Sequence, residues 1–224
     1  PEYTGNGAFF FDRADEPGWN DADTAYQTVR ELDLERNDLV WLQPAQANNT
    51  WAMSVRRDLA DAEGLETLDD LAAYLNDGGD FRFAASAEFV DSESALPAFQ
   101  SAYGFELDSD QLLTLSGGDT AATMRAAAQP DNDVNGAMTY GTDGGVNALG
   151  LVVLEDTRGV QPVYQPTPVV RAEVLDAYPE IADILDPLFA RLDLETLQTL
   201  NARVAVEGQP AREVAADYLE QLND

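Results

Sequence analysis

Four aromatic residues stand beside Gly, Asn, Thr or Pro rather than inside apolar runs: Tyr3, Trp51, Tyr140 and Tyr164. Such positions are typical of loops, and loops held by a rigid scaffold carry many binding residues. The face of a Tyr or Trp ring attracts a cation by about 0.5 to 2 kcal/mol, and a quaternary ammonium group is recognised in this way. Any one of these rings could be a packing residue, but the four together predict an aromatic cage for a quaternary ammonium compound.

The composition excludes most familiar catalytic chemistry. The chain has no histidine and no cysteine, so it lacks the commonest general base, the commonest metal ligands and any thiolate nucleophile. The acidic clusters at residues 12–16 and 61–66 lack the spacing of a calcium-binding loop. We therefore expect no catalytic residue, no metal and no cofactor. A hydrolase that uses paired carboxylates is the alternative, because Asp and Glu abound.

The charge of the chain is strongly acidic. Among 224 residues, 42 are Asp or Glu and 12 are Lys or Arg, which gives a formal net charge of -30. All the basic residues are arginine. Since the acidic residues are spread along the chain, we interpret them as a surface adapted to molar salt, where the Debye length falls to about 3 Å. An acidic protein with a basic partner is the alternative, and nucleic acid is not expected as a partner.

Short β-rich runs alternate with helical patterns, which predicts an α/β fold. Thr67 and Asp70 have capping-box spacing before a helix over residues 67–75, and Asp119 is expected to cap a helix that Pro130 stops. Seven strands are expected: Asp38 to Leu42, Thr50 to Arg56, Phe81 to Ala85, Leu112 to Leu115, Gly136 to Tyr140, Leu151 to Glu155 and Val163 to Arg171.

Beyond about residue 172 the pattern is almost wholly helical, and we expect its apolar stripes to lie in the core. One stripe contains Ile181, Ile184, Leu185 and Leu188, and another contains Leu194, Leu197 and Leu200. No segment reaches the roughly 18 apolar residues that a membrane-spanning helix needs. The sequence also holds no signal peptide and no lipid-attachment cysteine, so we expect any targeting segment or membrane anchor to lie outside it.

Several segments recur in the order known from one protein family: Pro1–Gly5, Leu39–Leu42, Asn48–Ala52, Tyr140–Gly144, Leu151–Asp156, Tyr164, Pro168–Arg171, Leu200–Asn201 and Val206–Gly208. In these segments the chain resembles, nearly end to end, the substrate-binding proteins of glycine betaine/choline/carnitine ABC importers. The resemblance implies two α/β lobes of the type II periplasmic-binding-protein kind, joined by a two-strand hinge. We expect lobe one at residues 1–54 and 165–224 and lobe two at residues 55–164, with the first βαβ part of lobe one absent from this sequence.

The resemblance also implies roles for individual residues. Tyr3, Trp51, Tyr140 and Tyr164 match cage positions, with tryptophan at 51 where the family commonly has tyrosine. Asn49 falls where a polar or acidic residue borders the cage. Asn6 falls where a family threonine offers its hydroxyl to the carboxylate of the ligand.

Ser92 departs from the family pattern, because an arginine that clamps the betaine carboxylate is usual there. The bidentate charged partner is therefore missing. Ser92 could still contribute one neutral hydrogen bond, worth about 0.5 to 1.5 kcal/mol. This difference shifts the expectation toward choline, or toward a zwitterion held by other donors, and leaves both glycine betaine and choline as candidate ligands.

The function implied is that of a non-enzymatic binding protein, extracytoplasmic and associated with the cell surface. It would capture a quaternary ammonium osmoprotectant and deliver it to an ABC permease, whose ATPase supplies the energy. An osmolyte-sensing domain of the same fold is the first alternative, and the carboxylate-dependent hydrolase is the second.

Overall fold

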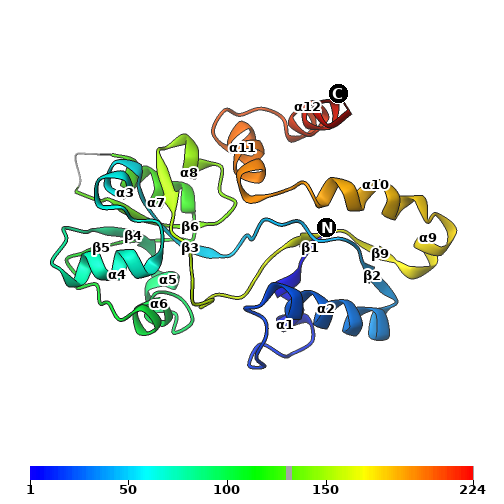
Figure 1. Ribbon diagram of the computed structural model, residues 1–224, viewed down its shortest axis with the longest axis horizontal. Helices are drawn as coiled ribbons and strands as arrows, with labels where there is room; N and C mark the ends of the chain where they lie inside the picture. The colour runs from blue at the N-terminus through cyan, green and yellow to red at the C-terminus, as the bar shows by residue number, and fades with distance from the viewer. Residues whose placement is uncertain (130–132, 224) are drawn as a thin grey trace. The chain divides into compact units, whose positions relative to one another are not determined.

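The computed structural model describes residues 1–129 and 133–223. The chain divides into two compact units, the first containing residues 1–50 and 162–197 and the second containing residues 51–161 and 198–224 (Figure 1). It passes from one unit to the other after Thr50, after Gln161 and after Leu197. The first two passages lie near the expected hinge strands, and the third lies within helix α11 (Leu194–Ala205).

This division differs from the expected lobes at the C-terminal end. We expected residues 198–224 in lobe one, whereas the structure groups them with the second unit. The reason is local hydrogen bonding: Gln198 donates to the carbonyl of Gly141, and Asn201 donates to the carbonyl of Thr142. The last helix, α12 (Ala211–Asn223), follows α11, and Arg203 pairs with Asp217 between the two helices.

The second unit is built on a five-stranded sheet in the order β5-β4-β6-β3-β7. Strand β4 pairs in parallel with β5 and β6, and β3 pairs in antiparallel fashion with β6 and β7. Each of these strands coincides with an expected one. Their bounds are β3 (Trp51–Arg56), β4 (Phe83–Ser86), β5 (Leu112–Leu115), β6 (Gly136–Tyr140) and β7 (Leu151–Val153).

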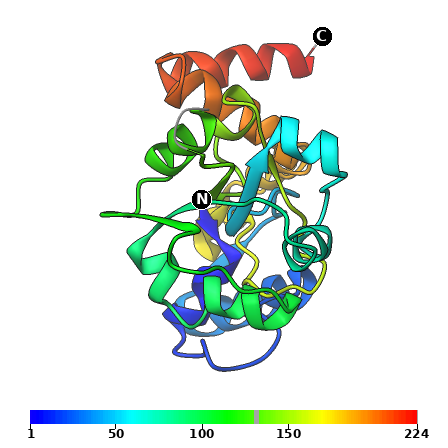
Figure 2. The ribbon, with the colours of Figure 1, turned by 90° about the vertical axis from the view of Figure 1, so that its left-hand side faces the viewer.

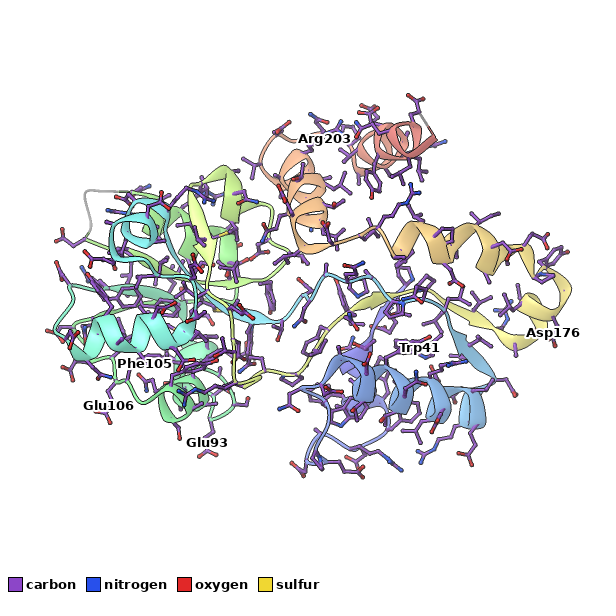
Figure 3. All side chains as sticks on the ribbon, in the orientation of Figure 1. Trp41, Glu93, Phe105, Glu106, Asp176 and Arg203 are labelled. Atoms are coloured by element: carbon purple, nitrogen blue, oxygen red, sulfur yellow. The ribbon has the colours of Figure 1, made fainter. Side chains whose placement is uncertain are left out.

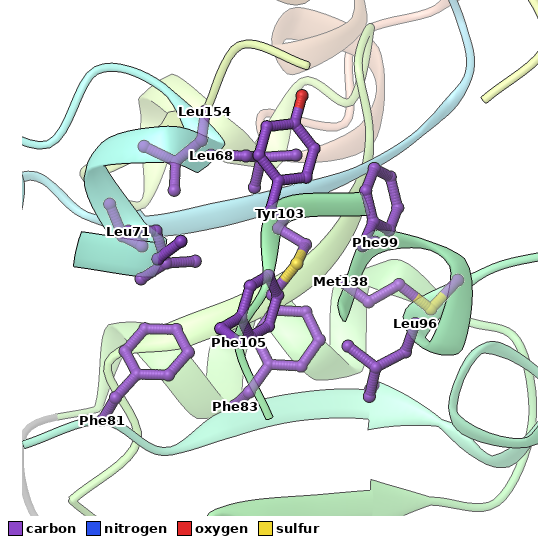
Figure 4. Packing of buried hydrophobic residues seen from close by; sticks show 14 of the residues in the cluster. Leu68, Leu71, Phe81, Phe83, Leu96, Phe99, Tyr103, Phe105, Met138 and Leu154 are labelled. Carbon is purple, nitrogen blue, oxygen red and sulfur yellow. The ribbon is translucent and has the colours of Figure 1, made fainter. Parts of the chain in front are cut away.

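Alternation along the strands sorts their side chains onto two faces of this sheet. Met53, Phe83 and Met138 belong to the larger core, which α4 (Leu68–Asn76), α5 (Ala87–Asp91) and α6 (Leu96–Tyr103) cover (Figure 4). Ala84 and Ala137 belong to the smaller core, under α7 (Thr120–Ala128) and α8 (Gly145–Ala148). Helices therefore lie on both faces of the sheet, as Figures 1 and 2 show. A further helix, α3 (Arg57–Glu63), follows directly after β3.

Local capping explains where two helices of the second unit begin. At α4 the Thr67 side chain accepts from the Asp70 N–H, and the Asp70 carboxylate accepts from the Thr67 N–H, which confirms the expected capping box. At α7 the Asp119 carboxylate accepts from the Ala121 N–H at 2.9 Å, as expected. Pro130, expected to stop that helix, lies outside the described residues.

The first unit contains two short antiparallel ribbons. Strand β1 (Glu2–Tyr3) pairs with β8 (Pro166–Thr167), and β2 (Leu39–Trp41) pairs with β9 (Val169–Arg171). We expected one strand over residues 163–171, but the structure has two, on either side of Pro168, which has no N–H to donate to a ladder. The short η1 (Thr4–Asn6) and α1 (Gly7–Phe10) follow β1.

The core of the first unit gathers on α2 (Ala22–Asn37), which Asp21 caps through the Thr24 N–H. Trp41 is 2% exposed, and its indole N–H donates to the Asp33 carboxylate at 2.6 Å. The other members of this core are Ala8, Phe11, Trp19, Ala25 and Val29.

The C-terminal helices of this unit correct one expectation. In α10 (Glu180–Phe189), which follows α9 (Ala172–Ala177), no residue is buried, although the structure describes all of them, and Ile184 is 65% exposed. Leu194 in α11 is 38% exposed. The assignment of these stripes to the core was therefore wrong. The reason is that a 3.6-residue spacing identifies the apolar face of a helix but not whether another element covers it.

Acidic side chains lie on the outside of both units. Glu93, Glu106 and Asp176 are exposed, whereas Trp41 and Phe105 are buried, as Figure 3 shows. Within the described ranges, no helix is both long and apolar enough to cross a membrane.

Candidate ligand-binding site

Trp51 and Tyr140 are brought together by strand register. They are directly opposite each other where β3 begins and β6 ends. Their ring centroids are 6.5 Å apart with an angle of 29° between the ring planes. Two residues far apart in the sequence thus form one aromatic surface, because cross-strand neighbours lie on the same face of a sheet.

Phe89 on α5 fixes the orientation of the Trp51 ring. The two rings meet edge to face, with centroids 5.7 Å apart, an arrangement that aromatic pairs favour. Phe89 itself is fully buried and contacts Phe83 and Phe99. The Trp51 ring therefore rests on the larger core and is held in place by it.

Ser92 follows α5 directly and is the residue that ends it. Its hydroxyl lies 3.0 Å from the hydroxyl of Ser94, and its N–H donates to the carbonyl of Glu88. The hydroxyl therefore has a protein partner of its own, and its predicted contact with a ligand remains a prediction.

The turn after Tyr140 is held by its own Asp143 and by residues of α7 and α11. The Asp143 carboxylate accepts from the Tyr140 N–H at 2.8 Å and also hydrogen-bonds the Thr120 side chain. From α11, Gln198 donates to the Gly141 carbonyl at 2.7 Å, and Asn201 donates to the Thr142 carbonyl at 2.9 Å. Sequence reasoning missed these supporting roles, because carboxamides on an amphipathic helix carry no pattern that indicates a distant turn.

Glycine at 144 is required by the close approach of α11. A Cβ atom at this position would lie 2.1 Å from the backbone nitrogen of Ala202. The Gly-Gly sequence after Asp143 could therefore have indicated a close backbone contact, since glycine allows one.

Three predicted residues gather in the first unit. Tyr3 and Asn49 are joined by a side-chain hydrogen bond. The Asn49 N–H donates to the Tyr164 carbonyl at 2.9 Å, and the Tyr164 N–H donates to the Asn48 side chain at 2.8 Å. Asn48 is therefore a supporting residue, although no role was predicted for it.

The Tyr164 ring lies directly against Gly5. A Cβ atom at Gly5 would come within 2.8 Å of two ring carbons. The glycine in the first motif therefore lets the chain pass beneath this ring. Burial raises the pKa of Tyr3, the Glu2 carboxylate raises it further and the bond with Asn49 lowers it, so this phenol stays protonated at neutral pH.

Asn6 is used inside the first unit. Its side-chain N–H donates to the Glu2 carboxylate at 2.6 Å, and the Tyr3 N–H donates to the same oxygen at 2.7 Å. The expected hydrogen bond from this position to a ligand carboxylate stays a prediction. The Glu2 carboxylate is a nearby negative charge that sequence reasoning did not single out.

A separate cavity of about 360 Å³ lies in the first unit, between Phe10, Trp41 and Val169. Glu2 and Asp33 also line it. It includes none of the predicted aromatic residues. In the part of the chain that is described, no group of three or more acidic side chains is arranged to hold a metal ion.

The predicted set thus falls into two groups, Trp51, Ser92 and Tyr140 in the second unit and Tyr3, Asn6, Asn49 and Tyr164 in the first. The family model for the substrate-binding domain of ABC-type glycine betaine transport systems matches residues 1–221. The chain belongs to this family.

Relatives of known description extend this result. The glycine betaine-binding protein YehZ of Escherichia coli (strain K12) is 58% identical over 221 residues, which are 99% of this chain and 72% of that protein. A glycine-betaine-binding protein of Pseudomonas aeruginosa is 34% identical over 226 residues, 98% of this chain and 70% of that protein.

The solved structure of apo YehZ from Escherichia coli matches this chain with a TM-score of 0.93 at 58% identity. The match covers 98% of this chain and 78% of that one. The expected fold class, a two-lobed α/β protein of the periplasmic-binding-protein kind, is thereby confirmed. This member of the family is a substrate-binding domain of an ABC-type transport system.

Proposed function

We propose that the protein captures a quaternary ammonium osmoprotectant, glycine betaine or choline, outside the cytoplasm and delivers it to an ABC permease. The observation that carries this proposal is family membership over residues 1–221, together with 58% identity to a protein named for glycine betaine binding. In this proposal the protein is a binder without catalytic activity, and the energy of transport comes from the ATPase that serves the permease.

The ligand would be held by the rings of Tyr3, Trp51, Tyr140 and Tyr164. Two features support this assignment. The register of β3 and β6 places Trp51 beside Tyr140, and Asn49 hydrogen-bonds both the Tyr3 side chain and the Tyr164 backbone. Ring faces suit a cation that cannot donate hydrogen bonds, and the Glu2 carboxylate beside Tyr3 favours a positive group.

Calorimetry in molar potassium chloride tests the proposal with the full-length protein. Titration with glycine betaine and with choline should give saturable binding of at least one of them and no chemical change in either. Absence of binding by both would overturn the proposed function. Product formation would support the hydrolase, while binding without uptake in cells that contain the permease and ATPase would support an osmolyte sensor.

Substitution of Tyr140 tests the aromatic cage. Tyr140→Leu keeps apolar bulk but removes the ring face, so it should weaken binding by about 1 kcal/mol or more, roughly fivefold, whereas Tyr140→Phe should retain most of the affinity. The control is Tyr178→Leu, a tyrosine that is 57% exposed in the first unit and should leave affinity unchanged. Equal affinity of the Tyr140→Leu and Tyr140→Phe variants would remove this ring from the cage.

A further inference from the structure

The indole N–H of Trp51 differs from those of the other tryptophans. It is buried, and among residues 1–129 and 133–223 it has no hydrogen-bond partner. By contrast, Trp19 donates to the Arg13 carbonyl at 2.8 Å and Trp41 donates to the Asp33 carboxylate at 2.6 Å. An indole nitrogen can only donate, and leaving a buried donor unpaired is unfavourable. An acceptor for the donor at position 51 would therefore come from outside the described residues, either as a water molecule or as part of a ligand.

The Trp51 ring has little freedom to turn toward another acceptor. Phe89 meets it edge to face on one side, and Tyr140 lies beside it across the strand pair. Phe89 belongs to the larger core, and Tyr140 belongs to strand β6 of the same sheet as Trp51. The N–H direction is thus set by packing before any ligand binds, which is the condition for a selective hydrogen bond.

The chemistry of the missing acceptor follows from the two proposed ligands. Glycine betaine has a carboxylate, whereas choline has a single hydroxyl group. A hydrogen bond from a neutral N–H to a carboxylate is stronger than one to a neutral hydroxyl oxygen, so a donor at position 51 would favour glycine betaine.

We propose that the Trp51 N–H donates to the carboxylate of a zwitterionic quaternary ammonium ligand, so that Trp51 selects betaines over choline. The edge of the indole would bind the carboxylate while ring faces of the site bind the ammonium group. This inference rests on the proposed function and sharpens it, because it favours glycine betaine although the expected arginine is absent at position 92.

Trp51→Phe tests the proposal, because phenylalanine keeps an aromatic face but has no N–H donor. Its smaller ring should affect the ammonium group of both ligands alike, so the ratio of the two affinities reports the loss of the donor. Calorimetry of the full-length protein should show that the substitution weakens glycine betaine binding about tenfold more than choline binding, the order expected for a hydrogen bond to a charged group. Trp19→Phe, which removes an indole N–H from the core of the first unit, should leave the ratio of the two affinities unchanged.

A second readout observes the bond itself. The chain has three tryptophans, and the indole resonance missing from the Trp51→Phe spectrum identifies Trp51 in ¹H–¹⁵N spectra. Glycine betaine should move this proton downfield and slow its exchange with solvent more than choline does.

Two outcomes would overturn the inference while leaving the proposed function intact. One is an equal loss of affinity for both ligands in Trp51→Phe, and the other is a Trp51 indole resonance that glycine betaine does not move. Failure of the native protein to bind either ligand would instead overturn the proposed function, and this inference with it.

Discussion

Asp143 is a half-buried carboxylate one turn beyond a predicted cage residue. Burial raises its pKa, and the nearby Asp119 carboxylate raises it further, while the hydrogen bonds from the Tyr140 N–H and the Thr120 side chain lower it; the net pKa lies above the ordinary value. As pH rises past about 4, the unfolded chain loses this proton before the folded protein does. The folded state is therefore increasingly disfavoured between the ordinary pKa and the raised one.

Asp143→Asn should remove this pH dependence, because asparagine can accept from the Tyr140 N–H without ionising. The difference in free energy of unfolding between variant and native protein should shift in favour of the variant as pH rises from about 4, and then level off. Chemical denaturation at a series of pH values measures it.

Asp69→Asn is a matched control of opposite sign. Hydrogen bonds from Thr157 and Arg158 lower the pKa of Asp69, so its ionised form stabilises the folded state, and that stability is lost as pH falls through the lowered pKa. Replacing Asp69 should therefore disfavour the variant increasingly as pH rises toward the ordinary pKa. A difference for Asp143→Asn that does not change with pH would contradict the assignment of a raised pKa.

At the scale of elements, α11 has a part in positioning the predicted site. Gln198 is 6% exposed and links two segments, because it donates to the Gly141 carbonyl and accepts from the Asn147 side chain. Asn201 holds the next carbonyl, that of Thr142. One face of this helix thus fixes the turn that follows Tyr140.

Gln198→Met should destabilise the second unit, since methionine has similar length but leaves the Gly141 carbonyl without its donor. The loss should be about 1 to 3 kcal/mol in the free energy of unfolding, as for other buried polar groups left unpaired. Gln221→Met, on the exposed side of α12, is the control and should change stability little. Equal stability of the two variants would show that the hydrogen bond to Gly141 contributes nothing.

Elements set by nearby residues were predictable, and those set by distant contacts were not. Thr67 and Asp70 are close enough in sequence for their capping box to be visible as a pattern. The short β-rich runs at β3 and β6 likewise indicated strands. The contact of Gln198 with Gly141 spans 57 positions, and no periodicity reports it. For the same reason, the sequence identified the apolar face of α10 but not its exposure to solvent. Ile184 on this face is 65% exposed.

At the scale of the whole molecule, the sequence indicated the fold class and the family, because many weak segments in a fixed order are jointly specific. The candidate site was predicted as a set of residues without an arrangement. Strand register joined Trp51 to Tyr140, and Asn49 joined Tyr3 to Tyr164. The Trp51 N–H lacks a partner among the described residues because of what surrounds the ring, so residue type alone could not reveal it.

Charge is the property of the whole molecule with the clearest consequence for stability. The excess of 30 negative charges gives a sequence pI of about 4.1, and exposed acids occur in both units. Repulsion between them opposes the compact state, and salt screens it. At pH 7, raising potassium chloride from about 0.05 M to about 2 M should therefore raise the thermal midpoint by roughly 5 °C or more.

The control is the same titration near the pI, where net repulsion is absent and the rise should be much smaller. A rise of equal size at both pH values would mean that salt acts through surface hydration rather than charge, and a fall at pH 7 would contradict adaptation to high salt.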